Sequence, residues 1–222
     1  MGDLVALSLR VATVVTAVSL PPAVATGYLL ARHRFRGRAL VQALVSLPMV
    51  MPPVAVGLLL LYLLGANGPL GFFWRATGIE LVFSWWAAAI AAAVVGFPLL
   101  VRAIRQSAEA IDPRYARAAR SLGASEPRIF FTVTLPLMAP GILTGITLAF
   151  ARAVGEFGAT ITLAGNIPGR TQTLPLALFT VTQSPGGDAA ALRLCILSLA
   201  LAGGALLLSE HIHRRVPQGA HA

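Results

Sequence analysis

Long apolar runs alternate with short polar segments along the whole chain. A helix of roughly 20 mostly apolar residues is long enough to cross the hydrocarbon core of a bilayer. The pattern predicts five such helices, at about residues 4–31, 40–64, 83–101, 137–164 and 190–209. We therefore expect an all-α integral membrane protein in which residues 1–222 form a single transmembrane domain with five spans.

The composition agrees with a membrane protein and excludes several other classes. The chain of 222 residues is 57% hydrophobic and only 11% charged, whereas a soluble domain carries about 25% charged residues. A soluble enzyme, a disordered chain and a disulfide scaffold are excluded for the chain as a whole. Its one cysteine, Cys195, stands in an apolar run, and we expect a small buried side chain there.

All 17 basic residues are arginine. Without lysine the chain cannot carry the phosphate-binding loop of a nucleotide hydrolase. Twelve arginines fall in segments on one side of the predicted spans: Arg32, Arg34, Arg36, Arg38, Arg102, Arg105, Arg114, Arg117, Arg120, Arg128, Arg214 and Arg215. Only Arg75 and Arg170 fall in segments on the other side. The positive-inside rule then predicts an inner or plasma membrane protein with its N-terminus outside and its C-terminus in the cytoplasm. This placement explains the net charge of +9 without nucleic acid.

Proline is dense in the second apolar run. Pro48, Pro52 and Pro53 lie within six residues, and such breaks are tolerated in membranes where protein or a cavity satisfies the freed carbonyls. We expect a non-ideal segment near a pathway there, and an interruption of the first helix at Pro21 and Pro22. A further apolar stretch, residues 174–181, is too short to span and predicts an interfacial or re-entrant helix.

The longest cytoplasmic segment contains a predicted helix-turn-helix at about residues 112–128. Asp112 can cap a helix whose first residue is Pro113. Gly123 provides a stop, and Ser125 can cap a second helix. Three arginines at a spacing of three share one face of the first helix: Arg114, Arg117 and Arg120. Such a face suits either anionic lipid headgroups or another protein.

The spacing in this segment resembles the signature loop of the inner-membrane permeases of ATP-binding-cassette importers. That loop reads Glu-Ala-Ala, a glycine four residues later, and a hydrophobic-x-Leu-Pro ending. Here Ala118-Ala119, Gly123 and residues 133–136 match, while Arg117 replaces the glutamate. In that family the loop docks on the ATPase subunit. The resemblance implies this coupling role for Arg114, Arg117, Ala118, Ala119, Arg120, Gly123, Ala124 and Ser125.

Other segments resemble one branch of the family, the molybdate permeases, with sulfate permeases as near relatives. They are residues 97–105, 118–124, 128–136, 148–162, 166–169, 184–187 and 191–196. Gly-Glu-Phe-Gly-Ala at residues 155–159 points to the transport of tetrahedral oxyanions. The resemblance implies a type I importer built on a homodimer of this chain. Its partners are two cytoplasmic ATPase subunits, which hold ATP and magnesium, and a periplasmic or lipid-anchored molybdate-binding protein. This chain then binds no cofactor and catalyses no reaction.

The fourth predicted span carries two opposite charges, Arg152 and Glu156. Residues four apart share a helix face, and a pair costs less in hydrocarbon than either charge alone. The pair either lines a pore or gate or is a structural ion pair. The histidines, His33, His211, His213 and His221, stand in basic or terminal segments. We expect them to be solvated and predict no metal site.

Several alternatives remain open at this point. Sulfate, thiosulfate or tungstate could replace molybdate as cargo, because the binding protein largely selects the substrate in importers of this kind. A membrane enzyme would need polar catalytic residues clustered at one interface. A proton-driven carrier would favour unpaired carboxylates in the spans and detectable sequence halves. Neither pattern is present in this sequence.

Overall fold

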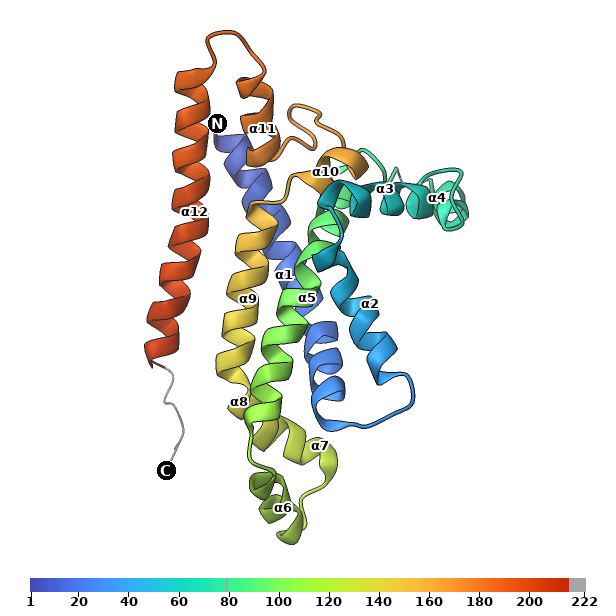
Figure 1. Cartoon of the computed structure of the whole chain (residues 1–222), viewed down its shortest axis with the longest axis vertical. Coiled ribbons are helices and arrows are strands. Elements are labelled where there is room, and N and C mark those ends of the chain that lie inside the picture. Colours follow the sequence, from blue (N-terminus) through green and yellow to red (C-terminus); the bar gives the residue numbers. More distant parts are fainter. Residues whose placement is uncertain (79, 216–222) are drawn as a thin grey trace.

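The helices lie mostly along one long axis (Figure 1). The computed structural model describes residues 1–78 and 80–215, and these contain helices and no strand. The start of α1 and the short helices α3, α4, α10 and α11 lie towards one end. The α1–α2 connection and helices α6 to α8 lie at the other, which gives the molecule two chemically different ends. The helical content of the described residues confirms the all-α prediction.

Three helices make the centre of the bundle: α1 (Gly2–Arg32), α5 (Trp85–Ala110) and α9 (Ala139–Val154). Their buried contact residues are mostly small, such as Ala12, Ala88 and Ala149. Small side chains allow helix backbones to approach closely, and van der Waals contact drives helix association in lipid. Contrary to expectation, α1 runs through Pro21 and Pro22 without a break, because α5 and α9 support it along its length.

The second apolar run is broken, as its density of proline predicts. It forms α2 (Arg38–Val50) and α3 (Pro53–Leu64), and the chain bends by 116° between the two helices. Pro48 stays within α2, and the break comes at Pro52 and Pro53. Met51 is extended, as expected for a residue that precedes proline. A short helix, α4 (Gly71–Thr77), follows α3.

The fourth apolar run is also broken, and residues 137–164 do not form one helix. The chain enters through α7 (Glu126–Ile129), a π-helical segment (Phe130–Thr134) and α8 (Leu135–Leu137), then bends by 65° into α9. At the far end α9 stops at Val154, and α10 (Gly158–Leu163) starts after a three-residue break.

Two helices complete the chain, α11 (Leu174–Thr182) at the site of the predicted short helix and α12 (Asp188–Arg215). Helix α12 lies at the edge of the bundle (Figure 1). Cys195 on α12 is exposed, so the expected burial is wrong. An apolar run in a peripheral membrane helix faces lipid as readily as protein, and the sequence does not distinguish the two.

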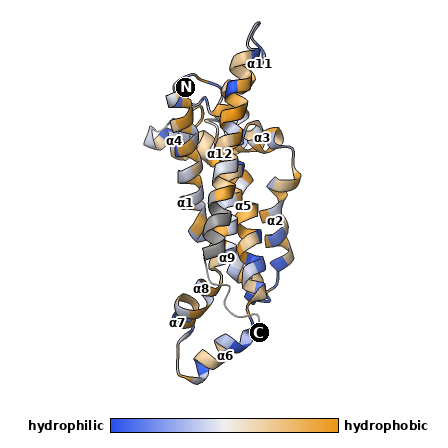
Figure 2. Cartoon of the chain, turned by 90° about the vertical axis from the view of Figure 1, so that its left-hand side faces the viewer, coloured by the Kyte–Doolittle hydropathy of each residue, from blue (hydrophilic) through white to orange (hydrophobic). Residues whose placement is uncertain are grey.

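The number of spans depends on the bent pairs. In the described residues three helical stretches are long and apolar enough to cross a membrane: Gly2–Arg32, Trp85–Ala110 and Asp188–Leu207. There are up to five if each bent pair counts as one span. Figure 2 shows hydrophilic residues on α6 (Pro113–Ser121) and on the ends of the neighbouring helices. The arginines of the α1–α2 connection share that end with those of α6, whereas Arg75 and Arg170 lie towards the other.

Candidate functional site

Helices α6 and α7 form a helix-turn-helix at the end of the bundle that carries the arginines of α6 and of the α1–α2 connection, which we call the basic end. Oδ1 of Asp112 accepts a hydrogen bond of 2.8 Å from the backbone N–H of Arg114, which caps α6. Gly123 has a φ of +81°, in the left-handed region that favours glycine. Ser125 stands at the N-cap position of α7, but its hydroxyl makes no capping bond. Pro127 lacks an N–H group, which removes one of the two backbone donors that such a cap can bind.

An ion pair closes this turn. The guanidinium of Arg120 contacts both carboxylate oxygens of Glu126, Nε to Oε1 and Nη2 to Oε2, the second at 2.9 Å. The hydrogen bond and the charge of Arg120 hold the pKa of Glu126 below its usual range, and Glu126 raises the pKa of Arg120. The side chain of Arg120 is therefore directed towards α7.

Glu126 is a residue that the sequence reasoning missed. The available signal was a lone acidic residue six positions after an arginine, across a predicted glycine turn. The other predicted loop residues, Arg114, Arg117, Ala118, Ala119 and Ala124, lie on or next to this helix-turn-helix and are at least partly exposed. The surface that they form is thus accessible in the single chain.

The C-terminal end of α1 contacts the same loop. Nη2 of Arg32 donates a hydrogen bond of 3.0 Å to the carbonyl of Ile111, the residue before Asp112. The ring of Tyr28 packs edge-on against Phe130, with centroids 4.9 Å apart. These two contacts tie α1 to both ends of the helix-turn-helix. The sequence could not reveal them, because α1 and the loop are about 80 residues apart.

Arg152 and Glu156 do pair, but not along one helix as predicted. Helix α9 stops at Val154, and Glu156 lies in the break before α10. Its Oε2 is 2.6 Å from Nη1 of Arg152, while its Oε1 accepts a 2.8 Å hydrogen bond from the N–H of Ala159. The Glu156 side chain is only 1% exposed. It thus neutralises Arg152 and also caps α10.

The two broken runs meet each other. A Cβ atom on Gly57 of α3 would lie 2.7 Å from the carbonyl oxygen of Ala159 on α10. A Cβ atom on Gly158 would lie 2.8 Å from Cβ of Pro53. Both contacts are closer than real Cβ atoms allow, so glycine is required on both sides. The break at Pro52 and Pro53 and the break at Glu156 therefore form one structural unit.

The helix-turn-helix and the Arg152–Glu156 pair lie in separate parts of the structure. The helix-turn-helix lies at the basic end, and Arg152 lies in the last turn of the 16-residue helix α9, about 20 Å along the axis from its start. Within the described residues no group of three or more metal-ligating side chains is present. The side chains of His211 and His213, and all of His221, lie outside the described part.

Comparison with known proteins identifies the family. Residues 23–217 match the family described as binding-protein-dependent transport system inner membrane component. The chain belongs to this family of transport permeases. The predicted class, a membrane-embedded transport subunit and not an enzyme, is thereby confirmed, and so is the predicted membrane location.

Individual relatives are more specific. The molybdenum transport system permease protein ModB of Escherichia coli K12 is 51% identical over 213 residues, covering 95% of this chain and 92% of its own length. The protein of the same name from Haemophilus influenzae is 48% identical, with the same coverage. The sulfate transport system permease protein CysT of Salmonella typhimurium is 38% identical over 82% of this chain and 64% of its own.

Solved structures confirm the fold. A bacterial ABC transporter that imports the polysaccharide alginate superposes with a TM-score of 0.75 at 17% identity, over 97% of this chain and 79% of the other. An inward-facing MetNI methionine ABC transporter superposes with a TM-score of 0.74 at 19% identity, over 95% and 93%. The chain therefore has the fold of an importer permease.

Proposed function

We propose that this chain is the permease subunit of an ATP-driven molybdate importer. The observation that carries the proposal is the 51% identity to a molybdenum permease over 95% of the chain. The cargo passes inward from a periplasmic or lipid-anchored molybdate-binding protein. ATP and magnesium are bound by two cytoplasmic ATPase subunits, and this chain binds no cofactor.

The permease works as a homodimer. Helix α2 has no buried residue in the single chain, although it carries the polar side chains Gln42 and Ser46. Polar side chains within a membrane face protein or water and not lipid. A second copy of the chain, packed against α2, supplies these protein contacts, and the pathway runs between the two copies. The outer face of α12 remains in contact with lipid.

The α6–α7 helix-turn-helix is the coupling element that docks on the ATPase. The capped first turn, the left-handed Gly123 and the Arg120–Glu126 pair fix its shape, so a push on it moves it as a unit. Arg32 and Tyr28 pass the movement to α1 as well as to the helices that continue the loop. Closure of the ATPase dimer then selects one of two arrangements of the bundle.

The joined breaks at Pro52 and Pro53 and at Glu156 form the gate region. Helices change direction there, and freed backbone groups are tolerated where they line a cavity or are satisfied by protein. Glu156 satisfies the start of α10 and neutralises Arg152. The pair therefore holds the gate in shape and does not itself bind the anion, because its carboxylate would repel it.

Uptake into proteoliposomes tests the function. The vesicles contain this chain, its ATPase and the loaded binding protein, and molybdate, tungstate and sulfate are compared with and without ATP. ATP-dependent accumulation of molybdate is expected. Accumulation of sulfate instead would favour the second candidate, a sulfate importer. The 38% identity to the sulfate permease CysT supports this second candidate. No ATP dependence by an assembled complex would contradict the proposal.

A further inference from the structure

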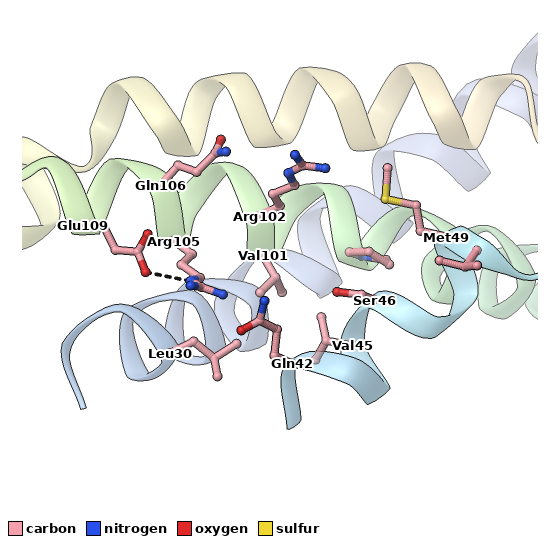
Figure 3. Close-up of a pocket in the computed structure, with 12 residues that line it drawn as sticks. Leu30, Gln42, Val45, Ser46, Met49, Val101, Arg102, Arg105, Gln106 and Glu109 are labelled. Atoms are coloured by element: carbon pink, nitrogen blue, oxygen red, sulfur yellow. Dashed lines mark hydrogen bonds and ion pairs between the residues drawn. The ribbon is translucent and has the colours of Figure 1, made fainter. Parts of the chain in front are cut away.

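A cavity of about 620 Å³ opens between α1, α2 and α5 at the basic end of the bundle. Four polar side chains that line it come as two pairs, each spaced four residues apart on one helix face. The pairs are Gln42 with Ser46 on α2 and Arg102 with Gln106 on α5. In Figure 3, Arg102 and Gln106 stand on the same side of α5. None of these four side chains makes a hydrogen bond within the described part of the chain.

The charge of this cavity is positive. Its one carboxylate, Glu109, is neutralised by Nε of Arg105 at 2.8 Å and by Nη2 of Arg38 at 3.5 Å. Figure 3 shows the Arg105–Glu109 contact. No carboxylate of the described residues lies within 4.0 Å of Arg102, so its charge is left for a ligand.

The position of Arg102 within α5 argues against a charge in a solvated loop. Arg102 lies 17 residues after Trp85, the first residue of α5, which is about 26 Å along the helix axis. Helix α5 continues beyond Arg102 to Ala110, so Arg102 stands within a long helix and not in a loop. Polar side chains on a helix that is apolar enough to cross a membrane need a water-filled or protein-lined space.

We propose that this cavity is a binding site for a tetrahedral oxyanion in the inner half of the transport pathway. Arg102 supplies the positive charge, and Gln42, Ser46 and Gln106 supply neutral hydrogen-bond donors. The cavity is much larger than one such anion, so the anion keeps part of its hydration shell and binds weakly. Weak binding suits a pathway, because a site that holds its cargo too firmly slows release.

This inference rests on the proposed function, and two sources offer the same chemistry. The oxyanion is either free cargo that has passed the gate or the phosphate of a lipid headgroup that enters from the inner leaflet. Free cargo exchanges with solution, whereas a lipid phosphate is carried with the purified complex. A binding measurement combined with lipid analysis separates the two sources.

The test uses the assembled complex of permease and ATPase in nanodiscs of zwitterionic lipid, without the binding protein. Equilibrium dialysis with radiolabelled molybdate measures saturable binding to the wild type, Arg102→Gln and Arg34→Gln. Arg34 is exposed in the α1–α2 connection at the same end and does not line the cavity. Loss of a charge-assisted hydrogen bond predicts binding weakened by about tenfold to a hundredfold in Arg102→Gln. Arg34→Gln is expected to bind as the wild type does.

A second variant, Gln42→Leu, removes a neutral donor and is expected to weaken binding less than Arg102→Gln. Equal binding by the wild type and Arg102→Gln, or no saturable binding by the wild type, would overturn the site. An anionic phospholipid retained by the wild type but lost from Arg102→Gln would assign the cavity to lipid and overturn its role in the transport pathway. The proposed function fails separately, if the wild-type complex shows no ATP-driven uptake.

Discussion

Arg120 in α6 and Glu126 in α7 face each other across the turn at Gly123 and make a two-point ion pair. The pair joins the two helices that a partner subunit would contact together. Both side chains are exposed, so the contact fixes the shape of the loop and adds little to global stability.

Glu126→Gln is expected to loosen this loop without unfolding the protein. Hydrogen exchange of residues 113–126 should become faster, while the core of α5 and α9 stays protected. ATP hydrolysis per molybdate transported should rise, because a loose loop transmits movement poorly. Glu80→Gln, which removes the carboxylate of an exposed ion pair with Arg170 away from this loop, serves as the control. Equal exchange in wild type and Glu126→Gln would contradict the expectation.

The pH dependence of this pair follows from the lowered pKa of Glu126. A carboxylate whose pKa is lower in the folded loop stabilises that loop above its unfolded pKa and loses this contribution as the pH falls through the folded pKa. Loop exchange, corrected for intrinsic rates, should therefore differ little between about pH 6 and about pH 8. The difference between wild type and Glu126→Gln should vanish only in acid. High salt should reduce it at neutral pH.

Substitutions at Gly123 distinguish the effect of backbone strain from the effect of a changed docking surface. A Cβ atom there meets no atom of the chain within 4 Å, and Asn and Asp tolerate the left-handed conformation. Gly123→Asn and Gly123→Asp are nearly the same size and differ in charge. Both should fold and assemble, and Gly123→Asp should uncouple ATP hydrolysis from uptake more strongly. Normal uptake by Gly123→Asp would defeat the docking role of the turn.

The Arg152–Glu156 pair is expected to behave as a buried ion pair. Arg152→Met leaves the Glu156 carboxylate buried without its partner, which costs about 3–5 kcal/mol. Glu156→Gln keeps an acceptor for the Ala159 N–H and should cost less. The double variant should be more stable than Arg152→Met alone. Thermal unfolding in detergent measures this cycle, and simple additivity of the two changes would show that the residues do not interact.

Gly57 offers a test of the contact between the two broken runs. Gly57→Ala should disturb the α3–α10 contact, because its Cβ would collide with the backbone of Ala159. Gly96→Ala on α5 is the matched control, since the nearest atom to its Cβ is 3.6 Å away. We expect Gly57→Ala to lose uptake and melt at a lower temperature, with Gly96→Ala close to wild type. Equal stability of the two variants would rule out the close approach.

The sequence by itself determined the class of the protein and much of its local structure. Hydrophobic length, arginine placement and the Asp112-Pro113 and Gly123 signals act over a few residues, so they can be read without a partner. The helix-turn-helix and the short helix at residues 174–181 follow from such signals. The Pro52-Pro53 break was likewise predicted from neighbouring residues.

Only the tertiary structure decided how the helices bend and what they contact. The 116° turn, the end of α9 before Glu156 and the unbroken course of α1 through Pro21 and Pro22 depend on packing against other helices. The tie from Arg32 to Ile111 and the cavity beside Arg102 join residues that are distant in sequence. Hydropathy records how apolar a residue is but not what it contacts, so it did not reveal that Cys195 is exposed.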